Sequence, residues 1–122
     1  MKYIEIRSYN LKPGSGTEFH RLFVDEALPL LRRWHVDVVT YGASLHHEDS
    51  YYLIRGFDSL AHREQSEESF YSSDEWRQGP RAAILALIET YTEIVLDLDD
   101  ASVEGMRRIS LDEGSDQNQP ER

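Results

Sequence analysis

The order in which the hydrophobic period changes along the chain limits the folds open to it more than any other feature. Residues 3–9 alternate between apolar and polar side chains, a pattern typical of a half-buried strand. Between Ser15 and Trp34, apolar residues recur every three or four positions, which is typical of a helix with one buried face. The same two patterns then predict strands over residues 36–46, 51–57 and 91–98, and helices over residues 60–71 and 81–88.

This order, βαββαβ, is the split βαβ pattern of the ferredoxin-like α+β fold. It predicts one four-stranded antiparallel sheet with the helices on one face. The opposite face then carries one of two sets of first-strand side chains: Tyr3, Glu5, Arg7 and Tyr9, or Ile4 and Ile6. Either set is bulky, and soluble monomers rarely expose so large a patch. We therefore predict a homodimer, a dimeric α/β-barrel in which two sheets close face to face with the helices outside.

Two local signals mark the first helix. Ser15 and Glu18 have the spacing of a capping box, in which each side chain satisfies a free amide at the start of a helix. Pro29 lacks the amide hydrogen that a helix interior uses, so we expect a bend between Asp25 and Pro29. The first helix should therefore begin at a side-chain cap and change direction before its end.

The charge balance bears on the partners of the chain. Its 122 residues include 23 acidic and 13 basic side chains, which gives a net charge of −10. Such a charge repels phosphate groups, so neither nucleic acid nor an anionic membrane is expected as a partner. The absence of cysteine excludes a disulfide scaffold, a thiolate metal site and a cysteine nucleophile.

The ends of the chain bear on its location and domain organisation. No apolar run approaches the ~20 residues that span a bilayer, and the strand-like start lacks the apolar stretch of a signal peptide. We therefore expect a cytoplasmic protein. The compact domain is predicted to cover residues 1–98. Residues 99–122 are predicted to form an acidic, largely disordered tail, with a short helix between Asp100 and Leu111.

Three short segments have a recognisable composition: Glu5-x-Arg7-x-Tyr9 with Leu11-Lys12-Pro13-Gly14, Phe57-Asp58-Ser59-Leu60-Ala61-His62-Arg63, and Asp74-Glu75-Trp76. They resemble, in this order, the opening, the segment after the third strand and the second helical region of NIPSNAP-type domains. The resemblance covers residues 3 to 98. It implies the dimeric α/β-barrel fold shared by small monooxygenases, haem-degrading enzymes and dehydratases. It implies no settled chemistry, because one fold serves many reactions.

Glu26 is the most informative catalytic candidate. At ~100° per residue, it falls within the apolar stripe of the first helix, where a carboxylate is unusual. Burial would raise its pKa and suit it to general acid or base catalysis. The alternatives are a place at the edge of the apolar stripe, or a structural ion pair with Arg7, Arg33 or Arg55. Two further catalytic candidates are Arg55, which could orient an anionic or carbonyl substrate, and Tyr41, which could donate a hydrogen bond to a developing oxyanion.

The substrate-binding candidates are an arginine and three ring-bearing residues. Arg7 shares a strand face with Glu5, so their charges must be paired if that face is buried. Arg7 is then either half of an ion pair that sets the dimer register or an anchor for a substrate carboxylate. His20 could be an axial haem ligand, but an ordinary core histidine is preferred, and no cofactor is predicted. Trp34 and Trp76 either pack in the core or line the pocket between sheet and helices that the resemblance implies.

The sequence leaves two classes of function open. In His46-His47-Glu48-Asp49, neighbouring side chains on an extended strand point to opposite faces, so no metal site is predicted. The first class is a homodimer with a small apolar pocket in each subunit, which binds a small organic ligand or acts on it as a cofactor-independent monooxygenase- or isomerase-like enzyme. The second is a non-catalytic interaction module or scaffold that uses its acidic surface. An open cavity beside Glu26 would favour the first class, and a packed interior the second.

Overall fold

The computed structural model of the chain describes residues 1–107, and the elements follow the predicted order. They are β1 (Lys2–Leu11), α1 (Gly16–Leu22), the π-helical turn η1 (Phe23–Ala27), α2 (Leu28–Arg33), β2 (Asp37–Ala43), β3 (Ser50–Phe57), α3 (Leu60–Tyr71), α4 (Asp74–Gln78), α5 (Arg81–Leu87) and β4 (Ile88–Leu98). A further helix spans residues 100–107. None of the described helices is long and apolar enough to cross a membrane.

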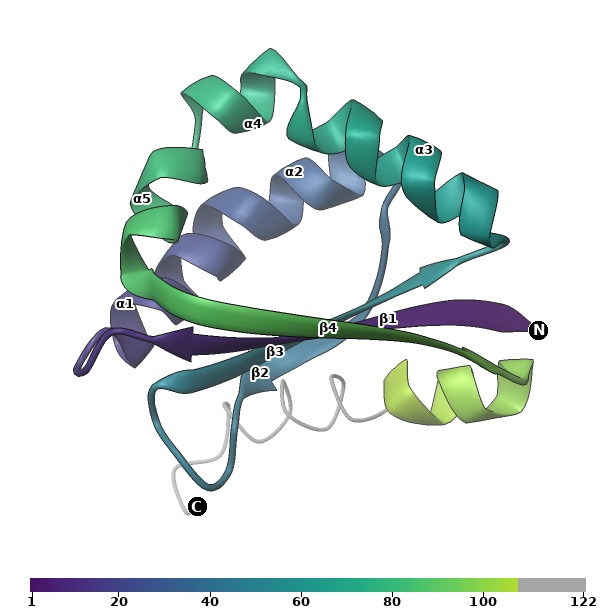
Figure 1. Ribbon diagram of the computed structural model, residues 1–122, viewed down its shortest axis with the longest axis horizontal. Coiled ribbons are helices and arrows are strands. Elements are labelled where there is room, and N and C mark those ends of the chain that lie inside the picture. The colour runs from purple at the N-terminus through teal and green to yellow at the C-terminus, as the bar shows by residue number, and fades with distance from the viewer. Residues whose placement is uncertain (108–122) are drawn as a thin grey trace.

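The strands form one sheet in the order β2-β3-β1-β4, and every neighbouring pair is antiparallel. Helices α1 to α5 cover one face of this sheet, and the helix over residues 100–107 lies on the other (Figure 1). The main core lies between α1–α5 and the sheet, and aromatic rings such as Phe19, Phe23 and Phe70 fill it. This arrangement confirms the ferredoxin-like α+β architecture predicted from the hydrophobic periods.

The structure decides which side chains of β1 face the helices. Tyr9 and Leu11 belong to the main core under the helices, so the odd-numbered side chains of β1 point there. Ile4 lies on the opposite face, in a separate apolar cluster that includes Val103 of the last helix. Of the two sets that the sequence left open, the set with Ile4 and Ile6 is therefore the one that faces away from the helices.

The capping box predicted at the first helix is not formed. The Ser15 hydroxyl donates to the carbonyl of Lys12 over 2.6 Å instead of capping the helix. The free amides of this turn are satisfied from another part of the chain, because the Asp49 carboxylate accepts from the amides of Gly14 and Gly16, each over 2.9 Å. A tertiary contact from the β2–β3 connection thus replaces the local cap.

The irregularity expected near Pro29 is a π-turn, η1, between α1 and α2. Hydrogen bonds in a π-turn run to the fifth residue, so each turn holds more residues than an α-turn. The direction of every later side chain is shifted accordingly. This shift explains why Glu26, placed in the apolar stripe by a constant 100° step, is exposed in the structure.

The first part of the predicted tail packs on the sheet. In the helix over residues 100–107, Val103 is 2% exposed against Ile4 and Ile54. Arg107 donates two hydrogen bonds of 2.7 Å to the carboxylate of Asp37, which ties this helix to β2. The short helix predicted from Asp100 is thus present over residues 100–107. The remainder of the predicted tail, residues 108–122, lies outside the described residues.

Candidate functional site

A carboxylate at the centre of β1 lies between three arginines. Glu5 is fully buried, and its Oε1 atom accepts from Nε of Arg7 over 3.0 Å and from Nε of Arg55 over 3.1 Å. Its second oxygen accepts from Nε of Arg63 over 2.7 Å. Arg55 comes from β3, where it pairs directly with Glu5 in the register of the sheet, and Arg63 comes from α3. This network therefore joins both layers of the fold.

Two further carboxylates complete this charge network, which we define as Glu5, Arg7, Arg55, Arg63, Glu67 and Glu93. Glu67, on α3, accepts from Nη2 of Arg55 over 3.0 Å and lies 3.9 Å from Nη2 of Arg7. Glu93, on β4, lies 3.3 Å from the same Arg7 atom. Three arginines thus face three glutamates, and the ionised network is neutral overall. The pairing of these charges makes their burial tolerable, since an unpaired charge in this position would be costly.

The pKa values of the two most buried glutamates, Glu5 and Glu67, are shifted in opposite directions. Burial alone would raise the pKa of Glu5, but the hydrogen bond with Glu67 and the charges of Arg55 and Arg7 outweigh it and hold this pKa below its usual value. Burial, followed by the hydrogen bond with Glu5, raises the pKa of Glu67 to about 7. A hydrogen bond between two carboxyl groups requires a proton on one of them. Glu67 is the group that holds this proton below its pKa of about 7.

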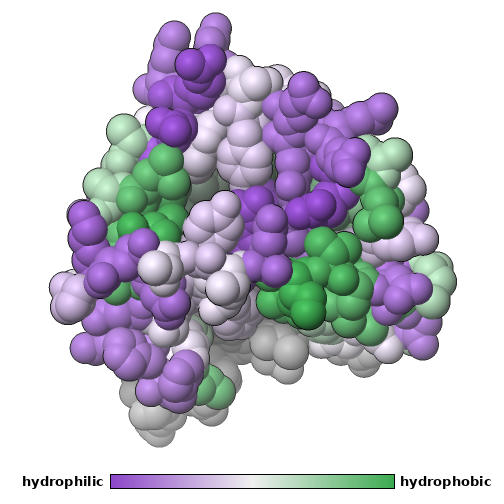
Figure 2. Space-filling model, viewed as in Figure 1, coloured by the Kyte–Doolittle hydropathy of each residue, from purple (hydrophilic) through white to green (hydrophobic). Residues whose placement is uncertain are grey.

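A cavity of about 370 Å³ opens beside the network, between the sheet and helices α3, α4 and α5. Its walls are mainly aromatic and aliphatic: Tyr9, Tyr71, Trp76, Ile84, Leu85, Ile88 and Tyr91. Two arginines, Arg7 and Arg81, also line it. A smaller hollow of about 30 Å³ lies next to it and shares Tyr9, Tyr71, Trp76 and Ile84 with it. On this side of the molecule, hydrophilic residues gather between hydrophobic patches (Figure 2).

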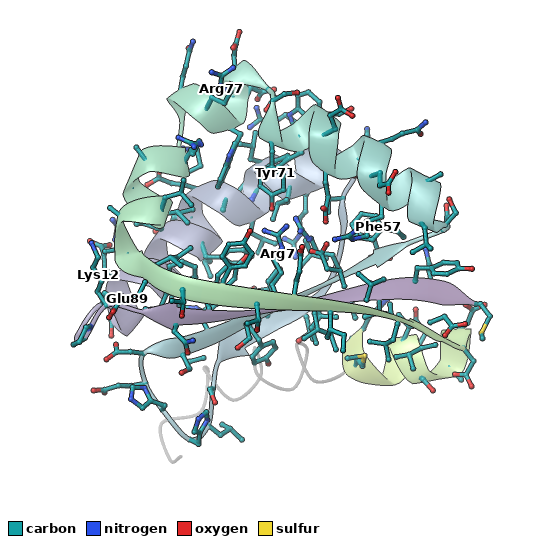
Figure 3. All side chains as sticks on the ribbon, viewed as in Figure 1. Arg7, Lys12, Phe57, Tyr71, Arg77 and Glu89 are labelled. Carbon is teal, nitrogen blue, oxygen red and sulfur yellow. The ribbon has the colours of Figure 1, made fainter. Side chains whose placement is uncertain are left out.

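Arg7 belongs to both the cavity and the charge network. Its guanidinium carbon lies 5.4 Å from the ring centroid of Tyr71 and 5.4 Å from that of Tyr91, so aromatic faces flank the cation. In Figure 3, Arg7 extends from the sheet toward Tyr71 on the helical side. Burial, with the neighbouring Tyr71, raises the pKa of Tyr9 to about 12, so this phenol keeps its proton and can donate a hydrogen bond. The part of the cavity formed by β1 therefore offers a cation at Arg7 and a phenol at Tyr9.

The structure brings only some of the predicted site residues together. Arg7 and Trp76 line the cavity as expected of substrate-binding residues. Arg55 does not line it: this side chain is 1% exposed, sits behind Arg7 in the charge network, and donates to the Tyr71 hydroxyl over 2.8 Å. In this geometry Arg55 positions Glu5 and Tyr71, and its predicted role of orienting a substrate stays a prediction.

The other predicted residues lie away from the cavity. Glu26 is exposed on η1 rather than desolvated, because the π-turn changes the direction of its side chain. The Tyr41 ring packs 5.1 Å from that of Phe23, and Nδ1 of His20 lies 2.7 Å from the Tyr51 hydroxyl.

The indole of Trp34 donates to Glu75 over 3.2 Å, at the surface where Arg33 also pairs with Glu75. At the β2–β3 tip, Nδ1 of His47 accepts from the amide of Asp49 over 3.1 Å. Within residues 1–107, no group of three or more side chains could hold a metal ion.

The sequence analysis did not identify Glu67, the carboxyl group on α3 whose pKa is raised to about 7. One signal was available, because Arg63, Glu67 and Tyr71 follow one another at four-residue spacing and so share a face of α3. Those residues contact Glu5 and Arg55 on the sheet beneath them. Apolar residues show little helical periodicity along α3. The sequence therefore does not reveal which polar face of α3 packs on the sheet and which faces water.

Comparison with known proteins identifies a family and solved structures that share this architecture. A family model described as NIPSNAP matches residues 4–98. A NIPSNAP family protein from Agrobacterium tumefaciens has a TM-score of 0.75 and 18% identity, over 82% of this chain and 95% of that chain. An uncharacterized NIPSNAP domain protein from Burkholderia xenovorans has a TM-score of 0.73 and 18% identity, over 80% of this chain and 95% of that chain.

A more distant likeness reaches beyond those proteins. A putative antibiotic biosynthesis monooxygenase from Bacteroides thetaiotaomicron has a TM-score of 0.63 and 11% identity, over 80% of this chain and 89% of that chain. A search of curated proteins found no match. At these identities, the likeness to solved structures concerns the fold alone.

Proposed function

The chain belongs to the NIPSNAP family, and on this premise we propose that it binds a small organic ligand in the cavity between its sheet and its helices, as one protomer of a homodimer. The observation that carries the proposal is the cavity of about 370 Å³ whose apolar walls surround the guanidinium of Arg7. Ligand sites have this character: concave, mostly apolar, and provided with a few convergent polar groups.

The polar groups of the cavity suit an enzyme that stabilises negative charge on its ligand. Arg7 supplies a fixed cation, and Tyr9 supplies a hydroxyl that stays protonated at neutral pH. Cationic and hydroxyl donors held in an apolar surrounding stabilise a developing oxyanion. This supports a cofactor-independent reaction of the isomerase or monooxygenase type on a small substrate, with Arg7 and Tyr9 as the groups that touch it.

The proposed homodimer uses the face of the sheet that lies away from α1–α5. Among the described residues, the helix over residues 100–107 contacts the part of this face around Ile4. Farther along β4, Ile94 is 63% exposed, and its neighbour in the register is Ile6 of β1. A second copy related by a two-fold axis would cover these side chains with the same set from its own sheet.

Native mass spectrometry of the freshly purified chain tests both parts of this proposal. We expect the mass of two 14.2 kDa chains with an additional small mass on each. Leu85→Trp, at a half-exposed position on the cavity wall, should remove the added mass. Leu60→Trp is the matched control, because Leu60 has a similar exposure, 54% against 45% for Leu85, but lies on α3 and does not line the cavity.

The alternative function gives a different result. An interaction module that works through its acidic surface would carry no small mass and would bind none of a panel of small aryl acids and amides. That result would overturn the proposed ligand site.

A further inference from the structure

We infer that the ligand of this cavity is a small monoanionic aryl carboxylate bound at Arg7, and that Glu67 takes up one proton when the anion enters. The inference rests on the proposed ligand site and deepens it in two respects. It gives the ligand a chemical class, and it couples binding to the charge network behind the cavity wall.

The charge of the lining selects an anion. Of the described residues that line the cavity, Arg7 and Arg81 are cationic and none is acidic. This is unusual for a chain with a net charge of −10, in which acidic side chains outnumber basic ones by 23 to 13. The guanidinium of Arg7 lies between two aromatic rings, and a ligand carboxylate in the cavity would share its donors with the glutamates that already face it.

The remaining wall selects an apolar, flat body. Trp76, Ile84 and Tyr71 line the cavity and also the smaller hollow next to it, which reaches toward Phe19 and Leu53 of the core. An aromatic ring placed against these side chains would bury apolar surface while its carboxylate stays at Arg7. The combination indicates an aryl carboxylate rather than an aliphatic polyol or a phosphate ester.

The charge count requires a compensating proton. Above pH 7, where Glu67 is ionised, three arginines and three glutamates balance in the empty site, and Arg7 lies 3.3 Å from Glu93 and 3.9 Å from Glu67. A bound carboxylate adds one negative charge beside these two glutamates. Excess charge in a half-buried site is costly, and a proton taken up by one glutamate restores neutrality.

Glu67 is the group placed to take that proton. It faces Glu5 and Arg7 of β1, Arg55 of β3 and Arg63 and Tyr71 of its own helix; Glu93 of β4 pairs with the same Arg7 and Arg63 atoms. Glu5 is held ionised by three arginines, and Glu93 is more open to water than Glu67, with 37% against 17% of the side chain exposed. The raised pKa of Glu67, caused by burial and then by the contact with Glu5, agrees with this assignment.

Isothermal titration calorimetry with 2-naphthoate and its neutral counterpart 2-naphthamide tests the inference. At pH 8, in two buffers of different ionisation enthalpy, naphthoate binding should consume close to one proton per site, and naphthamide binding none. The naphthoate affinity should fall about tenfold for each pH unit above 7, as binding linked to one proton requires. The naphthamide affinity should stay constant over the same range.

Two variants assign the proton to its carrier. Glu67→Gln should abolish proton uptake and bind naphthoate at pH 8 as tightly as the natural chain binds it at pH 6. Glu68→Gln, at the exposed neighbouring position on α3, should keep the uptake.

The outcomes separate this inference from the proposed function. If both probes bind with equal affinity and without protons, and Leu85→Trp blocks both, the ligand site stands and the inference is wrong. Uptake that persists in Glu67→Gln overturns the role of Glu67. If neither probe binds the natural chain, the inference is wrong, and the mass spectrum of the purified protein decides separately whether the cavity holds another ligand.

Discussion

Replacing Glu67 by glutamine should change how the stability of this protein depends on pH. In the folded chain, burial and the hydrogen bond with Glu5 raise the pKa of Glu67 to about 7, whereas the pKa of a glutamate in the unfolded chain is close to 4.5. Between these two values the folded state keeps a proton that the unfolded state has released. The free energy of unfolding must therefore fall as the pH rises through this window.

The size of the effect follows from the two pKa values. A difference of one unit corresponds to ~1.4 kcal/mol, so the contribution of Glu67 should decrease by ~2–3 kcal/mol between pH 5 and pH 8. Glu5 does not contribute in this interval, because its pKa is lowered and it is ionised in both states above pH 5. Glutamine preserves the shape and donor of the protonated side chain and has nothing to titrate.

Urea unfolding at pH 5 and pH 8 measures the effect. The natural chain should lose ~2–3 kcal/mol more than Glu67→Gln over this interval, and the difference between the two proteins removes the contribution of the histidines. Glu68→Gln, exposed on the same helix, should behave as the natural chain does. An equal pH dependence in the natural chain and Glu67→Gln would refute the assignment of the shared proton to Glu67.

Three further predictions concern other parts of the structure. Ile94→Glu should convert the proposed dimer to monomers in light scattering, while Leu60→Glu, on the helical side, should leave it intact; a dimer that survives Ile94→Glu would exclude this face. Glu5→Gln should lower the free energy of unfolding in urea by roughly 3–5 kcal/mol, because three arginines lose their common partner; a loss below ~1 kcal/mol would contradict the buried network. Asp49→Ala should cost about 1–2 kcal/mol and speed hydrogen exchange at the amide of Gly16, and unchanged exchange there would contradict the long-range cap.

Much of the fold could be predicted because backbone periodicity is a local property. Alternation over residues 3–9 and the three-to-four spacing after Ser15 correspond directly to β1 and to the α1–α2 segment. The end points were harder to predict: the second strand was expected to run to His46 but ends at Ala43, where the chain turns toward Asp49. The three short motifs correctly indicated the NIPSNAP family, whose model matches residues 4–98.

The candidate site could be predicted only in part. Arg7 and Trp76, two of the predicted substrate-binding residues, line the cavity, and their binding role stays a prediction. Glu26 was misplaced because one π-turn changes the direction of every later side chain, and no local pattern fixes its position. Arg55 was selected as a candidate, but the sequence did not predict that it lies behind the cavity wall, where it donates to the Tyr71 hydroxyl.

The amino-acid sequence by itself determined the order of strands and helices, the balance of charges and the family, because each depends on neighbours along the chain. Tertiary structure alone decided that Glu5 and Glu67, sixty-two positions apart, meet between three arginines, and that Ile4 rather than Tyr9 faces away from the helices. The physical reason is that the register between β1, β3 and β4 and the seating of α3 above them bring distant charges within 4 Å. That closeness, together with burial, raises the pKa of Glu67 to about 7.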